Sequence, residues 1–393
     1  MAEYKDPAGG TASTIGAQFR TDHYNKKALM EAKRTQFFSQ LASTESMPKN
    51  MGKKIKRYHY MPLLDDRNVN DQGINAAGAV IADGNLYGSS KDVGSITTKL
   101  PTLTENGGNV NRVGFKRLEL EGTLEKFGFY SDYTQESLDF DTDAELEMHV
   151  TREMVVGASE ITEDMLQVDL LTNAGTIRFG GVATATNQIT GEGANISLIT
   201  YEDLMRLDID LDNNRTPKQT KIITGTRMTD TKTISSARYM YIGTELQPMI
   251  EKMTDHFGNQ AFISVEKYAA GTTVAMGEIG TVGRFRIIVN PEMQHWAGAG
   301  ATETAANAGY RATAGKYDVY PMLVVGDESF TTIGFQTDGK SVKFNIKHSK
   351  PGSPESYAND KYGEKGFMSI KWYYGFMVLR PERLAVCKTV AEI

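Results

Sequence analysis

Apolar residues recur at helical intervals in the stretch 141–175, DTDAELEMHVTREMVVGASEITEDMLQVDLLTNAG. The average step is about 3.6 residues, the period of an α-helix, and the positions are Leu146, Val150, Met154, Gly157, Ile161, Met165, Val168 and Leu171. Thr142 and Glu145 have the spacing of a capping box, and Asn173 and Gly175 are typical of a helix end. We therefore expect one helix over 142–174, roughly 45 Å long, that acts as a spine for the elements packed across it.

A strand with one polar face is expected before this helix. Leu118 and Leu120 alternate with Arg117, Glu119 and Glu121, and the strand pattern continues through LEKFGFYSDYT toward the helix. A period of two is typical of a half-buried strand. The last part of the chain carries three more strand-like runs, YPMLVVG, SVKFNIK and FMSIKWYYGFMVL. We expect these runs to pair with the strand before the helix and to close a second core from distant parts of the chain.

The middle of the chain alternates helices and strands. Residues 176–199 are rich in Gly, Ala and Thr and are interpreted as short strands and turns. Thr200 begins a predicted helix, YEDLMRLDIDLD, that ends by Pro217. The strands KIITG, RYMYIG and RFRIIVN then flank a helix, LQPMIEKMTDHF. We interpret 200–316 as an inserted α/β subdomain, so the fold class is α+β.

The N-terminal region differs from the rest in pattern and in charge. An amphipathic helix is expected from Asp22, with Met30, Phe37, Phe38 and Leu41 on one side. The run PKNMGKKIKRYHYMPLLDD that follows is extended and basic, and we expect an arm with no part of its own chain to pack on. Residues 65–115 are rich in Gly, Asn and Asp, and they are either disordered or a long hairpin ordered by a partner.

Charge separates this region from the body of the protein. The chain of 393 residues has a net charge of −6, but residues 1–60 carry +6 and the remainder −12. The basic segment can lie on the body of another copy, face a polyanion, or be an ordinary solvated surface. Under the first alternative the candidate subunit contacts are Arg20, Lys26, Lys27, Lys33, Arg34, Lys53, Lys54, Lys56 and Arg57.

One segment matches a nucleotide-binding motif. Residues Gly334 to Ser341, GFQTDGKS, fit the phosphate-loop pattern, which requires a following helix whose N-terminus meets the phosphates. Here Val342, Phe344 and Ile346 alternate as in a strand instead. Asp-Gly between alternating runs favours a hairpin turn. A nucleotide-binding protein using this loop remains an alternative hypothesis.

No other pattern predicts catalysis or a cofactor. Cys387 is the single cysteine, and the six histidines are scattered without metal-site spacing. Asp208, Asp210 and Asp212 resemble the start of a calcium loop, but Asn213 stands where that loop needs Gly. We predict no catalytic residue, no metal and no cofactor. The chain lacks a long apolar run and begins without a signal pattern, so we expect no membrane association and synthesis in the cytoplasm.

Several segments resemble a known family. NDKYGEKGFMSIKWYYGFMVLRPERLAV, GEIGTVGRFRIIVNPEM and YDVYPMLVVGDESF are similar to segments of major capsid proteins from podoviruses related to coliphage N4. NKKALMEAKRTQFFSQLA and PLLDDRNVNDQGI near the start resemble the same family. The motifs occur in the family's order and span most of the chain.

The resemblance implies the Hong Kong 97-like fold of tailed-phage capsids. Its parts would be an N-terminal arm at 1–60, an extended E-loop at 61–115, a P-domain at 116–199 and 317–393, and an A-domain at 200–316. The implied function is structural: hexamers and pentamers form an icosahedral head around double-stranded DNA. Implied partners are other copies, scaffolding and portal proteins, and decoration proteins. A cellular nanocompartment shell of the same fold is a further alternative.

Overall fold

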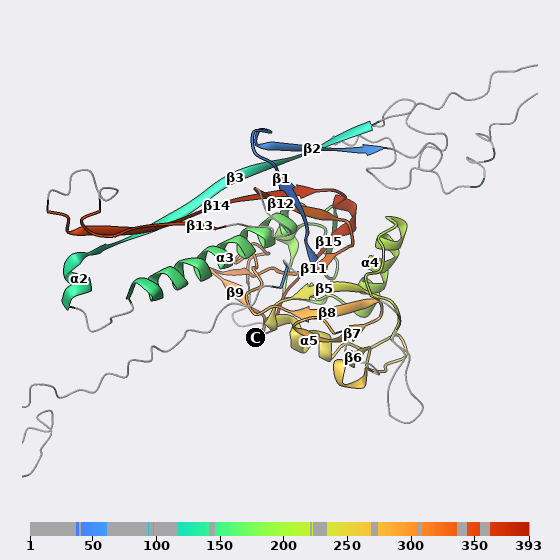
Figure 1. Ribbon diagram of the computed structural model, residues 1–393. Helices are drawn as coiled ribbons and strands as arrows, with labels where there is room; N and C mark the ends of the chain where they lie inside the picture. The colour runs from blue at the N-terminus through green and yellow to red at the C-terminus, as the bar shows by residue number, and fades with distance from the viewer. Residues whose placement is uncertain are drawn as a thin grey trace, which may run out of the picture.

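Two sheets and one long helix organise the chain (Figure 1). The computed structural model describes residues 37–38, 41–60, 93, 97, 117–140, 146–220, 222, 234–268, 274–304, 309–335, 344–353 and 362–392. The predicted helix from Asp22 lies mostly outside these residues, and the predicted E-loop lies outside them except for Val93 and Thr97.

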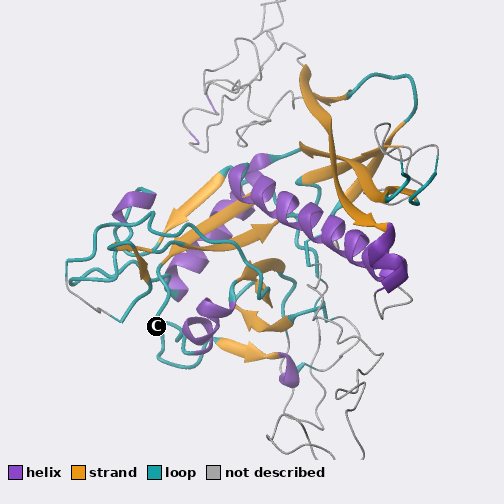
Figure 2. Cartoon of the chain, turned by 90° about the vertical axis from the view of Figure 1, so that its left-hand side faces the viewer, coloured by secondary structure: helices purple, strands orange, loops and turns teal. Residues whose placement is uncertain are grey.

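Helix α3, Leu146–Thr172, confirms the predicted spine. Its 27 residues make a rod of about 40 Å, and Asn173 follows its last turn and donates its backbone N–H to the carbonyl of Asp169. The capping-box residues Thr142 and Glu145 lie outside the described residues. Figure 2 shows the helix running diagonally between the strands of the two sheets.

The face that α3 buries differs in part from the predicted stripe. The buried apolar side chains, Met154, Ala158, Leu166 and Leu170, follow steps of four or eight residues. In contrast, Ile161 and Val168 are 42% and 48% exposed. A row with a spacing of four is inclined to the helix axis, and such inclined rows are what helices pack with. The buried row therefore crosses the helix surface obliquely. A stripe drawn with a period of 3.6 residues assigns exposed residues such as Ile161 and Val168 to the buried face.

The first sheet is long and mostly antiparallel. Its strand order is β1-β12-β14-β3-β2, with β13 also on β14. The strands are β1 Ser43–Met47, β2 Lys54–Tyr60, β3 Arg117–Thr134, β12 Phe330–Phe335, β13 Asn345–Ser349 and β14 Lys365–Val378. β14 pairs with β3 from Lys365–Thr134 to Phe376–Thr123, so the predicted pairing of the tail with the strand before the helix is confirmed for this run. A short helix, α2 (Gln135–Phe140), follows β3.

The phosphate-loop segment lies between two strands on the same side of β14. β12 pairs with Phe376–Val378 and neighbouring positions of β14, and β13 pairs with Phe367–Lys371. These two strands are therefore successive segments along β14 and do not pair with each other. Residues 336–343 lie outside the described residues. A strand, and not the helix that a phosphate loop requires, is the next described element.

The second sheet has the order β4-β15-β11-β5-β8-β7-β6 among the described residues. Its strands are β4 Thr176–Phe179, β5 Arg238–Ile242, β6 Phe262–Ser264, β7 Glu278–Val282, β8 Phe285–Val289, β11 Tyr320–Val325 and β15 Leu384–Thr389. Helices α4 (Tyr201–Asn213) and α5 (Gln247–Glu251) accompany it, and the short strands β9 (Ala312–Thr313) and β10 (Lys316–Tyr317) pair beside it.

Two of the three tail runs correct the expectation that each pairs with β3. The run SVKFNIK contributes to β13, which pairs with β14. Strand β11 pairs with β15 and β5. All six of its residues are buried, as expected for a central strand covered on both faces. The run YPMLVV lacks the alternation seen in β14, and that difference marks the sheet to which each run belongs. The second sheet thus combines strands from 200–316 with strands from 317–393 and with β4.

The basic run after residue 48 also packs differently from the prediction. β2 lies antiparallel on β3, from Lys54–Thr123 to Tyr60–Arg117, so this run does have a part of its own chain to pack on. Phe37 and Phe38 are buried in the core beside α3. The backbone N–H of Phe38 donates to Glu163 at 2.6 Å, and the hydroxyl of Tyr241 donates to the carbonyl of Phe37.

Candidate functional site

The predicted basic contact residues divide into two groups. Arg20, Lys26, Lys27, Lys33 and Arg34 lie outside the described residues, whereas Lys53, Lys54, Lys56 and Arg57 lie in or next to β2.

Three of the β2 cations pair with acids of their own chain. Lys54 reaches Glu121 at 3.1 Å, and Lys56 reaches Glu121 at 3.0 Å and Glu119 at 3.2 Å. Arg57 reaches Glu45 at 3.0 Å. The hydrogen bond from Lys56 lowers the pKa of Glu121, and the same bond raises the pKa of Lys56. Cross-strand pairs therefore use much of the positive charge of β2 within the subunit.

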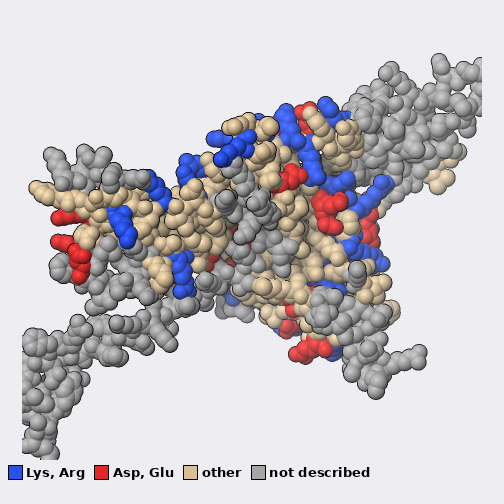
Figure 3. Space-filling view, in the orientation of Figure 1, with Lys and Arg blue, Asp and Glu red and all other residues tan. Residues whose placement is uncertain are grey.

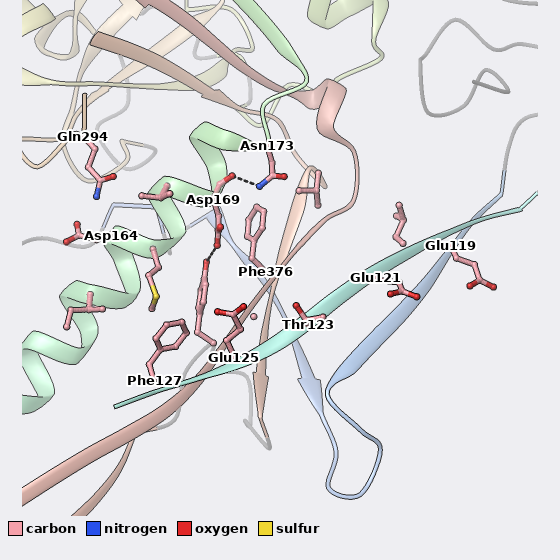
Figure 4. Close-up of a pocket in the computed structure, with 17 residues that line it drawn as sticks. Glu119, Glu121, Thr123, Glu125, Phe127, Asp164, Asp169, Asn173, Gln294 and Phe376 are labelled. Carbon is pink, nitrogen blue, oxygen red and sulfur yellow. Dashed lines mark hydrogen bonds between the residues drawn. The ribbon is translucent and has the colours of Figure 1, made fainter. Parts of the chain in front are cut away.

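An open groove of about 780 Å³ lies between α3 and the long sheet. Figure 4 shows β3 along one side, with the helix opposite. Ile161, Met165 and Val168 of α3 give the groove an apolar wall, with Phe127 and Phe376 from the strands. The remaining lining residues are Glu119, Leu120, Glu121, Thr123, Glu125, Asp164, Asp169, Asn173, Gln294, Tyr374, Gly375 and Val378.

The charged side chains of the groove are all acidic. Glu119, Glu121 and Glu125 share one face of β3, because odd positions of a strand point the same way. Asp169 points toward Glu125 from α3, whereas Asp164 lines the groove on the other side of the helix, beside Gln294. Elsewhere charges of both signs are interspersed, as on the face in Figure 3.

Asp169 occupies the closed part of this groove. The hydroxyl of Tyr374 donates to its carboxylate at 2.9 Å. Burial raises the pKa of Asp169, the Tyr374 bond opposes that rise, and the nearby charge of Glu125 adds to it. Burial also raises the pKa of Tyr374, so the group that donates to this carboxylate is a neutral phenol.

Sequence patterns indicated the parts of this groove but not the groove itself. The alternation of acids along β3 predicted a polar strand face. The missing information was that Ile161 and Val168 stay exposed and that Asp169 of α3 lies near Glu125 of β3. The spacing of Glu119, Glu121 and Glu125 is the one signal that could have drawn attention to it.

Side chains that could support catalysis are paired with other residues or buried. Asp208 and Asp212 bind Arg238, each at 2.6 Å, and Asp210 binds Arg178. Cys387 is fully buried, which raises the pKa of its thiol to about 12. In the described part of the chain no group of three or more His, Cys, Asp and Glu could hold a metal ion. None of the described helices is long and apolar enough to span a membrane.

Comparisons with known proteins identify relatives of the whole chain. The family described as phage capsid protein matches residues 117–388. A major capsid protein of Pseudomonas phage KPP21 is 60% identical over 391 residues, covering 100% of this chain and 98% of the relative. Among solved structures, the capsid of Ralstonia phage GP4 is similar with a TM-score of 0.55 and 12% identity, covering 98% of each chain. A capsid structure of cyanophage P-SCSP1u covers 99% of each chain with a TM-score of 0.50 and 11% identity.

The two sheets, the long helix and the extended strand pair are those of a capsid subunit with the Hong Kong 97-like α+β fold. The chain belongs to the phage capsid protein family. It is therefore a structural protein of the virion shell and not a member of an enzyme family. The α+β class, the resemblance to phage capsid proteins and the non-enzymatic function are confirmed.

Proposed function

We propose that the protein assembles as hexamers and pentamers into the icosahedral head that encloses the double-stranded DNA genome of a tailed phage. The observation that carries this proposal is the full-length match, at 60% identity, to a major capsid protein of a Pseudomonas phage. The extended shape supports it, because α3 and the β3–β14 strand pair present large surfaces such as those of Tyr130 and Met148, which are 67% and 58% exposed. Exposed apolar side chains of this size favour contact with other subunits.

The parts of the subunit have separate roles in this proposal. Residues 1–60 serve as an N-terminal arm, 61–115 as an extended E-loop, 116–199 and 317–393 as a P-domain, and 200–316 as an A-domain near the capsomer axes. The arm contacts a neighbouring copy through Arg20, Lys26, Lys27, Lys33 and Arg34. Lys53, Lys54, Lys56 and Arg57 lie at the base of the arm, where the pairs of Lys54 and Lys56 with β3 and of Arg57 with β1 orient it.

Other partners follow from the same role. The subunit is made in the cytoplasm of the host bacterium and meets scaffolding and portal proteins during assembly, with decoration proteins as possible later partners. Contact with DNA is nonspecific, because the body of the protein is acidic and repels phosphate. The podovirus group related to coliphage N4 remains the proposed source.

Electron microscopy of the expressed chain, alone and with the assembly proteins of its virus, tests the proposal. Closed icosahedral shells, or rings of five and six, are the expected result, and a discrete monomer or dimer under both conditions would refute it. A truncation lacking residues 2–34 should fold but fail to close shells. The deletion stops before Phe37 because Phe37 and Phe38 belong to the core, so loss of folding is not the expected outcome.

A nanocompartment shell of the same fold is the second candidate. Its particles would enclose protein cargo and no genome, so the nucleic-acid content of native particles separates the two functions. For the phosphate-loop alternative, Lys340→Ala would have to abolish saturable ATP binding. We expect no such binding, because strand β13 follows the loop.

A further inference from the structure

The groove beside α3 combines an apolar wall with charge of one sign. Ile161 and Val168 are 42% and 48% exposed although both are aliphatic residues of α3. A groove of this size that exposes apolar side chains is typical of a binding surface. Its occupant must bring apolar side chains for the wall and cations for the acids.

The two ends of the groove differ in how their acids are paired. Toward β2, Glu119 and Glu121 already bind Lys54 and Lys56. Toward the C-terminal end of α3, Asp169 is bound by the neutral hydroxyl of Tyr374 and lies close enough to Glu125 for the two like charges to interact. A cation placed at this second end would relieve that repulsion.

One segment of the chain has the matching composition. In NKKALMEAKRTQFF, the predicted helix places Lys26, Lys27, Met30, Lys33 and Arg34 on one face, at steps of three, four and seven residues. This face has an apolar residue between two pairs of cations. It therefore complements a groove whose apolar wall lies between acidic residues.

The root of the arm favours insertion into another subunit. Phe38 is held by Glu163, and Phe37 is held by Tyr241, so the chain is fixed immediately after the basic stretch. Only Thr35 and Gln36 separate Arg34 from this anchor, so the basic segment has little chain with which to turn back along its own α3. A nine-residue helix over 26–34 would span about 13 Å, well within the length of α3.

We propose that the groove between α3 and β3 binds the basic helix at residues 26–34 of a neighbouring copy of this chain. The proposal rests on the shell function above and names the surface that receives the arm. Lys33 and Arg34 pair with Glu125 and Asp169, and Met30 packs on Ile161 and Val168.

Disulfide trapping in assembled particles tests the contact. Val168→Cys is combined in turn with Lys26→Cys, Met30→Cys and Lys33→Cys, and the native Cys387 gives no background because it is fully buried. Non-reducing gels should show a ladder of linked subunits for at least one pair. The matched control replaces Val168→Cys with Ile209→Cys on α4, an apolar site of similar exposure, 57%, and should give at least tenfold less product.

Each result is decisive because assembly is scored separately by electron microscopy. Particles with a ladder support the proposal. Particles with no ladder for any pair, or with cross-links only inside single subunits, overturn it and leave the shell function intact. If the parent chain forms no particles with its assembly proteins, the shell function and the groove contact both fail.

Charge reversal gives a second, independent readout. Glu125→Lys with Asp169→Lys should reduce particle yield at least tenfold, and Lys33→Glu with Arg34→Glu should do the same. Combining all four changes in one chain should restore particles, because every reversed arm then meets a reversed groove on a neighbouring copy. Failure of the combined variant to restore particles, while each pair of changes alone abolishes them, would contradict the charge pairing.

Discussion

The second sheet and the long pair of strands β3 and β14 differ in how many of their side chains the subunit itself buries. In the second sheet, β11 buries all six of its residues, and Met240, Ile242 and Ile287 beside it are fully buried. In the projecting part of the first sheet, β13 exposes four of its five residues, and Tyr130 of β3 is 67% exposed. The second sheet has a core within the subunit, whereas the projecting part of the first sheet leaves side chains exposed that other copies can cover.

This difference explains why the subunit can be stable before assembly. Each fully buried aliphatic side chain contributes about 1.5–3 kcal/mol, so the second sheet and its helices can hold the fold. The strand pair contributes reach, since the 18 residues of β3 span about 60 Å. Helix α3 joins the regions, because one cluster includes Leu166 and Leu170 with Trp372 of the first sheet and Val386 of the second.

The largest effect should come from the buried charge network of the second sheet. Arg238 is 1% exposed and binds Asp208 and Asp212, each at 2.6 Å. Arg238→Ala leaves Asp208 buried with only the more exposed Arg284 as a partner, so we expect a loss of about 3–5 kcal/mol in the free energy of unfolding. Urea denaturation of the unassembled subunit measures it.

An exposed ion pair on α4, the helix that carries Asp208 and Asp212, provides the control. Arg206 binds Glu202 one turn away on α4, and both side chains are more than half exposed. Arg206→Ala should cost about 0.5 kcal/mol or less. Equal losses for the two variants would mean that the second sheet does not have the tightly packed character that separates it from the strand pair.

A proline in the joining helix should have the next largest effect. Val155→Pro removes a backbone hydrogen bond near the middle of α3 and introduces a clash, at a cost of about 3 kcal/mol or more. Because α3 packs on both sheets, we expect a lower melting temperature for the whole subunit in calorimetry. Val155→Ala, which keeps the helix, should have a smaller effect, and an unchanged melting temperature for the proline variant would contradict a single packed helix.

The elements of this fold were predictable where one local pattern decided the outcome. The period of 146–172 predicted α3, and Thr200 with Asp203 forms the capping box that starts α4. Alternation predicted β3 and β14, and also their pairing. In each case the sequence within one segment carries the information.

The arrangement of the elements was harder to predict because it depends on distant segments. The run YPMLVV does not by itself predict pairing with Arg238–Ile242, although its uninterrupted apolar character favours a central strand. The basic run of β2 resembled a free arm until acids some 60 residues later were found opposite it. Predicting the groove would require both of these strand pairings, together with the oblique buried row of α3, which a fixed helical period cannot represent.

The smallest effect should arise at Asp169, where the two regions meet. Burial, helped by Glu125, raises the pKa of this carboxyl in the folded state. As pH rises, the unfolded chain releases this proton before the folded chain does, so the contribution of Asp169 to stability is most favourable below its ordinary pKa and falls as pH rises through the folded pKa. Asp169→Asn keeps an oxygen for Tyr374 and removes the charge. We expect the variant to be more stable than the parent by less than about 1 kcal/mol at pH 7, with the difference shrinking toward pH 4.

Urea midpoints at the two pH values measure this, and Glu202→Gln on exposed α4 controls for overall charge. A less stable variant at pH 7 would mean that the groove already compensates Asp169 within the single chain, and the contrast between a complete second sheet and an incomplete long sheet would not hold at this position.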